Sequence, residues 1–325
     1  MPGIAETRTY DALLSTTLAN YSDKMSDNVF DVYPTLSWLN GKLGEALRGN
    51  KRLRLIDGGE SIVERLLYEM STSGGTYSNY GQLVITPQEG VTQARYNWRQ
   101  YAWTIAISGL EKRSNAGDAK MIDLLKTKTT QAEMSMRDRM SRDVFGTVVG
   151  GSDGISIDGL GILADSSGTL GGLSAATYTW WAATERASGS FAAQGINDMR
   201  IVFNTISFGN DTPDYIAMPQ AVFEYFEAYL QPQERYTNTK AANVGFSNLT
   251  FKAIPVMFDR DATAGQIFML NSDYINWCVH KDANLATGKF IEPENQDAMS
   301  AKILWQGNLT TNNRRMHGKL TGITA

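Results

Sequence analysis

The chain has 325 residues, of which 42% are hydrophobic and 20% are charged. This composition excludes an intrinsically disordered protein, and the length favours two compact lobes with appendages over one minimal domain. The formal net charge of −4 argues against a protein that wraps nucleic acid, because such proteins bind phosphates through a basic face.

Cysteine and targeting signals add further exclusions. Cys278 is the only cysteine, so neither an intrachain disulfide nor a cysteine-based zinc site is expected. Its apolar neighbours predict a small buried side chain. The start of the chain lacks a basic segment followed by a long apolar run, and no stretch reaches the roughly 18 apolar residues of a membrane helix. We therefore expect a soluble protein of a reducing cytoplasm, with no membrane partner.

Residues 1–50 are predicted to form a polar arm with short helical pieces. One piece begins near Asp11, and another ends at Gly41. The segment has too few apolar residues to form a core of its own. We expect it to lie against the rest of the chain or against a neighbouring chain.

Residues 51–107 are predicted to form a long hairpin. A strand at 51–56 enters a turn, and a second extended run at 91–107 alternates polar and apolar residues. Tyrosines and the flexible Ser73-Gly74-Gly75 lie between the extended runs. An isolated hairpin is marginally stable in water, so a long one implies a partner surface.

A long helix is predicted over residues 112–146. Apolar or small residues recur every three or four positions along one face, and Glu133 and Asp138 each lie four residues before an arginine. At 1.5 Å per residue the periodic part spans roughly 40 Å. The alternative, a coiled coil, is weaker because the pattern drifts from strict heptads.

The remainder mixes helices and strands without a regular repeat, which indicates an α+β architecture. A glycine-rich passage follows Gly146, with a strand-like stretch at 155–157. The pattern then predicts the following elements: a helix at 196–205, a strand at 215–218, a helix starting at Pro219, strands at 253–258, 266–270 and 277–279, and strand-like stretches at 301–309 and 314–320.

Catalytic patterns occur, but each lacks its structural context. Ser152 lies in a Gly-x-Ser-x-Gly sequence, whereas a nucleophile elbow needs a strand before the serine and a helix after it. A dinucleotide-type glycine pattern at 159–164 precedes a predicted loop instead of a helix N-terminus.

Metal ligands are also sparse. The two histidines, His280 and His317, are expected at the surface, and Asp259 with Asp261 is expected to stabilise a turn. We therefore expect no enzyme activity, no catalytic residue, no metal and no cofactor. The rival enzyme hypothesis is a serine hydrolase using Ser152.

Several segments, in order and at matching spacing, resemble the major capsid proteins of tailed double-stranded DNA bacteriophages, which share the Hong Kong 97-like capsid fold. The resemblance covers most of the chain beyond about residue 50. The segments that carry it are Ile107-Ser108-Gly109-Leu110-Glu111, Asp158-Gly159-Leu160, Thr169-Leu170-Gly171-Gly172-Leu173, Tyr178-Thr179-Trp180-Trp181, Pro219-Gln220-Ala221-Val222-Phe223-Glu224, Asn295-Gln296-Asp297-Ala298-Met299 and Ile303-Leu304-Trp305-Gln306-Gly307-Asn308-Leu309-Thr310-Thr311.

The resemblance implies a shell-building subunit with five parts. These are an N-terminal arm at 1–50, an extended hairpin loop at 51–95, a peripheral domain at 96–195 with its spine helix at 112–146, an axial domain at 196–290, and a C-terminal return to the peripheral domain at 291–325. Subunits of this kind assemble into hexamers and pentamers that close an icosahedral shell around phage DNA.

The hairpin and the residues beside it are where we expect contacts between subunits. Aromatic and arginine side chains commonly anchor such contacts. An alternative for Trp98 is packing inside its own subunit. The candidate contact residues are Arg65, Tyr68, Tyr77, Tyr80, Trp98 and Arg99.

The resemblance also sets expectations about partners. Some members weld their shells with an isopeptide bond from a lysine on the extended loop, but this chain has no lysine between Lys51 and Lys112, so that bond is not expected. The arm is too short for a built-in scaffolding domain. We expect a separate scaffolding protein, a portal, in some cases a cement or decoration protein, non-specific contact with packaged DNA, and assembly in the host bacterial cytoplasm. A nanocompartment shell of the same fold is the alternative.

Overall fold

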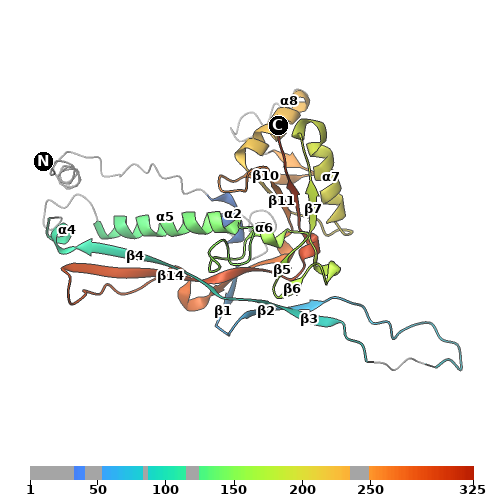
Figure 1. The fold of residues 1–325 in the computed structure, drawn as a ribbon, viewed down its shortest axis with the longest axis horizontal. Coiled ribbons are helices and arrows are strands. Elements are labelled where there is room, and N and C mark those ends of the chain that lie inside the picture. Colours follow the sequence, from blue (N-terminus) through green and yellow to red (C-terminus); the bar gives the residue numbers. More distant parts are fainter. Residues whose placement is uncertain (1–32, 41–52, 83–86, 115–123, 235–248) are drawn as a thin grey trace. The chain divides into compact units, whose positions relative to one another are not determined.

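The computed structural model describes residues 33–40, 53–82, 87–114, 124–234 and 249–325 (Figure 1). The described residues fall into two compact units. Unit 1 comprises those within Gln100–Arg139 and Asp282–Gln306, and unit 2 those within Tyr33–Arg99, Met140–Lys281 and Gly307–Ala325. The finer five-part division expected from the sequence stays a prediction.

The largest core of unit 2 surrounds a six-stranded mixed sheet. Its strand order is β7-β15-β11-β8-β10-β9, with β8 parallel to β10, and β7 parallel to β15. The central strands β8 and β11 are apolar throughout and fully buried, as expected of strands covered on both faces. The strands are β7 (Thr184–Ala187), β8 (Tyr215–Met218), β9 (Thr250–Phe251), β10 (Ile254–Phe258), β11 (Ile267–Leu270) and β15 (Gly318–Thr321).

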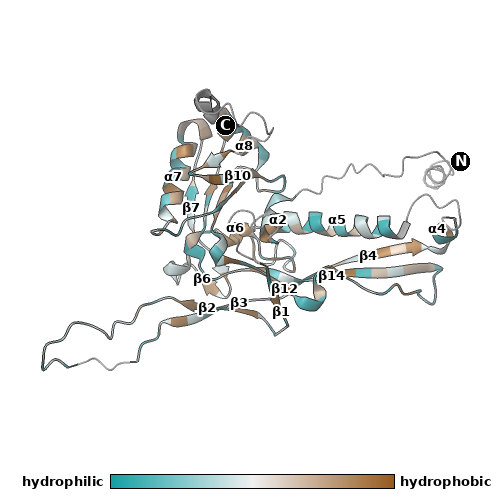
Figure 2. Cartoon of the chain, turned by 180° about the vertical axis from the view of Figure 1, so that it is seen from behind, coloured by the Kyte–Doolittle hydropathy of each residue, from teal (hydrophilic) through white to brown (hydrophobic). Residues whose placement is uncertain are grey.

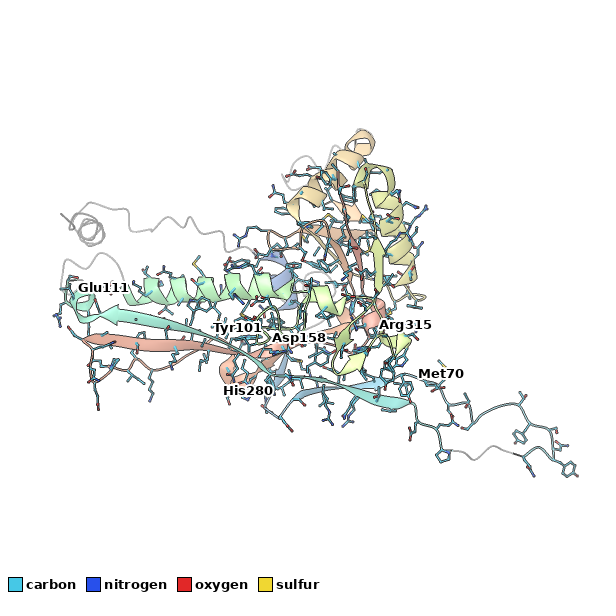
Figure 3. The ribbon with its side chains drawn as sticks, viewed as in Figure 1. Met70, Tyr101, Glu111, Asp158, His280 and Arg315 are labelled. Carbon is cyan, nitrogen blue, oxygen red and sulfur yellow. The ribbon has the colours of Figure 1, made fainter. Side chains whose placement is uncertain are left out.

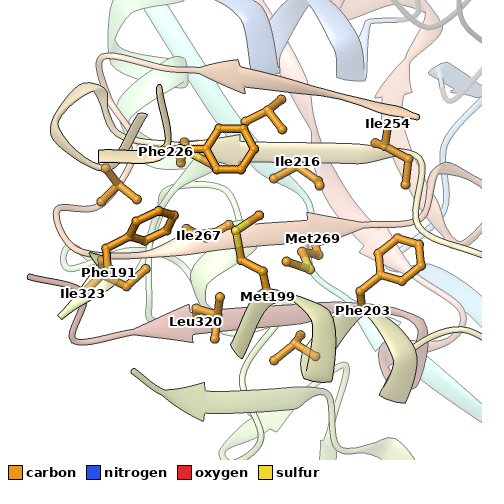
Figure 4. Packing of buried hydrophobic residues seen from close by; sticks show 14 of the residues in the cluster. Phe191, Met199, Phe203, Ile216, Phe226, Ile254, Ile267, Met269, Leu320 and Ile323 are labelled. Carbon is orange, nitrogen blue, oxygen red and sulfur yellow. The ribbon is translucent and has the colours of Figure 1, made fainter. Parts of the chain in front are cut away.

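Two helices pack their apolar stripes on this sheet. A π-helical turn, η2 (Phe191–Gly195), leads into α7 (Ile196–Thr205), and α8 (Gln220–Glu234) follows Pro219, whose carbonyl accepts the first helical N–H bonds. Figure 4 shows side chains from both helices meeting those from the strands. The shared core includes Phe191, Met199, Val202, Phe203, Ile216, Val222, Phe226, Ile267, Met269 and Leu320.

Part of the predicted arm is also integrated into unit 2. Helix α2 (Pro34–Leu39) buries Trp38, whose ring stacks on Tyr215 at a centroid distance of 4.2 Å. The backbone N–H of Thr35 donates to the buried carboxylate of Asp259, which also accepts from the N–H of Asp261. Residues 33–40 thus lie against their own chain, and the prediction that these aspartates stabilise a turn is confirmed.

A second group of strands in unit 2 carries the hairpin. Strand β1 (Leu53–Ile56) runs parallel to β12 (Ile275–His280), which pairs antiparallel with the last residues of β14 (Ala298–Thr311). The hairpin itself is β2 (Ile62–Leu67) paired with β3 (Val91–Tyr96). Smaller elements complete the unit: α6 (Leu160–Leu163), β5 (Thr169–Leu170), β6 (Leu173–Ser174), η1 (Thr179–Trp181), η4 (Ser272–Tyr274) and η6 (Arg314–Met316).

Unit 1 contains the earlier part of β14 with its partners and most of the predicted long helix. Strand β4 (Arg99–Ser108) and β13 (Ala286–Thr287) pair with β14, and Tyr101 on β4 meets Trp305 on β14 edge to face. The short helix α4 (Gly109–Ser114) follows β4, and η5 (Lys281–Ala283) precedes β13. Arg113 pairs with Asp297 at 2.6 Å, which ties α4 to the residues just before β14.

The predicted spine helix is observed as α5 (Leu124–Val144). Its buried stripe is Ala132, Met136, Met140 and Val144, the predicted face, and Glu133 pairs with Arg137 four residues on. Figure 2 shows α5 mainly in teal and white, as expected of a helix that buries one stripe. The predicted start near residue 112 falls on α4, and residues 115–123 lie outside the described part.

Three local predictions are wrong. The run at 91–107 is broken between β3 and β4, where Trp98 turns to donate its indole N–H to the Gly59 carbonyl at 2.8 Å. Residues 155–157 form no strand, because the Asp153 carboxylate accepts the N–H groups of Ile155 and Ser156 and holds a turn. The stretch predicted as a strand at 314–320 begins as η6 instead.

Arg314 explains the third difference. Its fully buried guanidinium donates to the carbonyl oxygens of Ile162, Leu163, Asp165 and Ser167. The arginine therefore satisfies carbonyls at the end of α6, and the chain around it coils instead of extending.

Candidate intersubunit surface

The β2–β3 hairpin has two chemically different faces because strand side chains alternate. On the inner face Ile62, Leu66, Ala94 and Tyr96 are buried, and so is the carboxylate of Glu64. The opposite face, called the outer face below, is exposed and pairs Val63 with Arg95, Arg65 with Gln93, and Leu67 with Val91.

Polar contacts fix which face points outward. The buried Tyr96 hydroxyl donates to the Thr311 carbonyl at 2.9 Å, and burial raises the pKa of this tyrosine above its usual range. Glu64 accepts from the Thr310 hydroxyl at 3.0 Å and from Arg54 at 3.2 Å. The inner face is therefore bonded to strand β14 and to the segment before the hairpin, and rotation of the hairpin would break these bonds.

The outer face and the tip expose apolar area that the subunit itself does not cover. Leu67 is 77% exposed and Val91 is 70% exposed; at the tip, Tyr77 is 70% exposed and Tyr80 is 98% exposed. Figure 3 labels Met70, which is 87% exposed, near the point where the paired strands give way to the long loop. Exposed apolar clusters of this kind mark surfaces that bind other proteins.

Tyr68 lies just beyond the last pair of the β2–β3 ladder, at the root of the loop that leads to the tip. Its hydroxyl donates to the Glu89 carbonyl across the hairpin at 3.1 Å, and its ring stacks on Trp180 at a centroid distance of 5.3 Å. The stacked pair forms one wall of a cavity of about 310 Å³. The cavity is lined by Leu66, Leu67, Tyr68, Trp180, Trp181, Phe208, Asp211, Tyr274, Asn312, Asn313, Arg315 and Met316, and is called the root pocket below.

Trp98 and Arg99 are held inside their own chain. The Trp98 ring meets His280 edge to face at 5.9 Å, in addition to its bond to Gly59. Arg99 donates to the Gly154 carbonyl at 2.7 Å and pairs with Asp158 at 3.4 Å, and its side chain is 11% exposed. These two candidates stay predictions as intersubunit contacts, while the structure gives both an intramolecular role.

Asp158 is the centre of that intramolecular network. One carboxylate oxygen accepts from the Gly150 N–H at 2.7 Å, and the other accepts from the Asn308 amide at 2.9 Å. The Asn308 amide also donates to the Asn97 carbonyl. The network joins the end of β3, the turn after α5 and strand β14, so it positions the base of the hairpin.

The six candidate residues thus separate into two groups. Arg65 lies on the outer face, Tyr77 and Tyr80 at the tip, and Tyr68 at the root, whereas Trp98 and Arg99 point inward. Sequence reasoning did not single out Leu67 and Val91 or the root pocket. Residues 62–67 read Ile-Val-Glu-Arg-Leu-Leu, which does not alternate polar and apolar residues and so gave no signal for Leu67, and the pocket joins residues from distant parts of the chain.

The rival catalytic patterns lack catalytic geometry. Ser152 is exposed in a turn that follows helix α5, with no strand before it. In the dinucleotide-type pattern, residues 160–163 form the four-residue helix α6, and the predicted loop follows at 165–168. The glycines serve close packing: a Cβ on Gly159 would lie 2.4 Å from the Gly146 backbone nitrogen.

The two histidines differ in burial, and His280 is partly exposed. His317 is fully buried, which corrects its predicted surface position, and burial lowers its pKa to about 3. In the described part of the chain, no three side chains of the metal-binding types gather into one group. The same part contains no helix long and apolar enough to cross a membrane.

Comparison with known proteins finds likeness at the level of structure. No family model and no curated protein sequence matches the chain. Among solved structures, the capsid asymmetric unit of cyanophage A-1(L) aligns with a TM-score of 0.67 at 14% identity, over 94% of this chain and 97% of that one. The capsid of Myoviridae phage XM1 aligns with a TM-score of 0.56 at 11% identity, over 99% and 100% of the two chains.

An encapsulin is similar as well. The holo-SrpI encapsulin complex of Synechococcus elongatus PCC 7942 aligns with a TM-score of 0.58 at 10% identity, covering 95% of this chain and 94% of that one. The mixed helix-and-strand fold is therefore the one that phage capsid subunits and this encapsulin share, and the expected fold class is confirmed.

Proposed function

We propose that this chain, which has the fold of tailed-phage capsid subunits, is a major capsid protein that assembles into hexamers and pentamers of an icosahedral shell. One observation carries the proposal beyond the fold. The hairpin fixes its inner face with buried bonds and leaves Leu67, Val91, Tyr77 and Tyr80 exposed. A subunit that must be covered by neighbours explains this exposure, and a monomeric function does not.

The proposed shell needs further partners. A separate scaffolding protein would set its size, a portal would admit DNA, and a cement or decoration protein would add non-covalent strength in some particles. Contact with packaged DNA would be non-specific and weak, because a chain with a net charge of −4 gains little from phosphate neutralisation. Assembly would take place in the host bacterial cytoplasm, and the shell would persist in the virion.

Electron microscopy and light scattering on the purified chain alone test the proposal. Capsomer-sized rings, sheets, tubes or closed shells are expected. A stable monomer at every concentration, with and without a candidate scaffolding protein, would contradict it. If the chain alone builds uniform shells of one size, the expectation of a separate scaffold is wrong while the capsid assignment stands.

A second candidate function is a nanocompartment shell, which the likeness to the SrpI encapsulin favours. The two functions differ in what the particle encloses. Particles purified from the native source would contain genomic DNA if the chain is a phage capsid protein, and a protein cargo without DNA if it is a nanocompartment shell. Nuclease-protected DNA measured per particle decides between them.

A further inference from the structure

The root pocket has aromatic walls and a polar rim. Tyr68 stacks on Trp180, Trp180 meets Trp181 edge to face at 5.8 Å, and the Arg315 guanidinium lies 5.2 Å from the centre of the Phe208 ring. Asn312 and Asn313 line the pocket as well. A volume of about 310 Å³ lies at the lower end of the roughly 300–1,000 Å³ typical of ligand pockets, a size suited to one or two ring-bearing side chains.

The charged side chains that line the root pocket limit which occupants it can bind. The lining contains one acid, Asp211, and one base, Arg315. Asp211 accepts hydrogen bonds from the Tyr274 hydroxyl and the Asn271 amide, so its charge is already engaged. A cationic occupant would lose hydration without gaining a free carboxylate, and an anionic occupant would meet only Arg315, which is exposed and lies over the Phe208 ring. The pocket therefore favours an uncharged, aromatic occupant whose polar end can reach the asparagine rim.

The hairpin tip has these properties. Residues 70–82 contain no charged side chain and include Met70, Tyr77 and Tyr80. Tyr80 is 98% exposed, and Tyr77 is 70% exposed. A tyrosine combines a large apolar ring with a hydroxyl, which matches a pocket lined both by aromatic rings and by the amide side chains of Asn312 and Asn313.

The tip of the hairpin is uncharged, carries tyrosine rings and lies at the other end of the loop from the root pocket, and these three properties indicate one occupant. We infer that the root pocket of one subunit receives Tyr80 from the hairpin tip of a second copy of this chain, an inference that rests on the proposed capsid function. The 14 residues from Leu67 to Tyr80 span up to roughly 45 Å when extended, and Figure 1 shows the loop beyond β2 and β3 extending away from the paired strands. Each subunit then offers a tip and receives one at its root, a heterologous contact that can close into rings.

A photoreactive side chain at position 80 tests the inference while keeping an aromatic ring. Tyr80→p-benzoylphenylalanine is incorporated into the full chain, assembled particles are irradiated, and crosslinked peptides are identified by mass spectrometry. Crosslinks to the segments 66–68, 180–181, 208–211 or 312–316 of a second copy are expected. The matched control carries the same group at Tyr229, which is 42% exposed on α8, and is expected to crosslink elsewhere.

The outcomes separate this inference from the capsid proposal. If particles form and the position-80 crosslinks map outside the root pocket, the pocket inference is overturned and the capsid function stands. If the unsubstituted chain forms no assembly under any condition, the capsid proposal fails and the inference fails with it. Light and heavy isotope-labelled chains are mixed before assembly. A crosslinked peptide pair that contains one light and one heavy peptide then shows a crosslink between two chains.

A substitution series provides an independent readout. Tyr80→Ala is expected to raise the protein concentration needed for half-maximal assembly about tenfold or more, as for an anchor residue at an interface. Tyr80→Phe is expected to recover most of that loss because the ring is retained. Trp180→Ala should act like Tyr80→Ala, and the double variant should lose little more than either single one. Strictly additive losses would overturn the pairing of tip and pocket.

Discussion

Asp158 shows how one buried carboxylate can organise a region where three segments meet. It accepts hydrogen bonds from Gly150 and Asn308 and pairs with Arg99, and its side chain is 5% exposed. Removing one partner of a buried ion pair leaves the remaining buried polar groups without a partner. This loss usually costs more folding stability than replacing the whole pair by apolar residues.

The change Asp158→Ala is therefore expected to lower the unfolding free energy of the unassembled subunit by about 3–5 kcal/mol. Urea denaturation followed by tryptophan fluorescence measures this quantity. The control is Glu60→Ala at an exposed position, for which a change within about 0.5 kcal/mol is expected. Equal effects of the two substitutions would show that the Asp158 network adds nothing to stability.

His317 makes stability depend on pH. Its ring is fully buried, Nδ1 accepts from the Asn271 N–H, and Nε2 contacts the Thr311 hydroxyl. Desolvation by burial lowers its pKa from 6.5 to about 3, so between these values the unfolded chain binds a proton that the folded chain does not. Folding stability from this residue is complete above pH 6.5 and falls by about 1.4 kcal/mol per pH unit below it.

Substituting His317→Gln tests that pH dependence. Between pH 6.5 and pH 4 the unfolding free energy of the variant is expected to fall less steeply with decreasing pH, by about 1.4 kcal/mol per pH unit, because glutamine does not titrate. Unfolding free energies at pH 7.0, 5.5 and 4.5 measure the slope, and carboxylates common to both proteins cancel in the comparison. Parallel pH profiles for the two proteins would contradict a neutral buried histidine.

At the scale of elements, the residues with strong local periodicity were predictable and those governed by distant packing were not. Helix α7 and strand β8 were predicted with the observed bounds, because a 3.6-residue stripe and a short apolar run are local signals. The buried stripe of α5 was predicted for the same reason. The burial of His317 and Arg314 depends on partners in remote segments, which periodicity does not report.

The candidate site shows the same division. The sequence predicted a projecting hairpin with aromatic residues at its tip, and the structure places Tyr77 and Tyr80 there. Packing of Trp98 inside its own subunit was one of two alternatives, and its bond to Gly59 agrees with it, whereas the pairing of Arg99 with Asp158 was not predicted. Both inward contacts arise at the break between β3 and β4, where a continuous alternating pattern hides a change in direction.

The two faces of the hairpin give an element-scale prediction. Leu67→Ser and Val91→Ser on the outer face are each expected to change the unfolding free energy of the subunit by no more than about 0.5 kcal/mol. Together they should raise the concentration for half-maximal assembly about tenfold, because exposed apolar area that neighbours cover is lost. Light scattering against concentration measures assembly.

The opposite face supplies the control for that experiment. Leu66 is 4% exposed, and Leu66→Ser is expected to destabilise the subunit itself by about 2–5 kcal/mol through a cavity and a buried hydroxyl. If the outer-face pair destabilises the subunit as much as Leu66→Ser does, the outer face belongs to the core of the subunit and is not a contact surface.

At the scale of the whole molecule, the distribution of lysine restricts how a shell of this chain can be held together. The hairpin and its strands contain no lysine between Lys51 and Lys112, so a lysine-derived isopeptide bond from the hairpin to a neighbour is chemically impossible. The exposed groups that the hairpin does offer include apolar rings, aliphatic side chains, two arginines and the carboxylates of Glu69 and Glu89. These form contacts by burial and hydrogen bonding, which denaturants reverse.

Purified, DNA-filled particles are therefore expected to dissolve completely into unit-length chains when boiled in sodium dodecyl sulfate with reductant, giving one band for this protein on a gel. Because Cys278 is the only cysteine and is buried, omitting the reductant should leave the result unchanged. A ladder of dimers to hexamers that survives reduction would contradict a non-covalent shell. Such a ladder would place the lysine end of the covalent link outside the hairpin, in the arm, the spine helix or the C-terminal half.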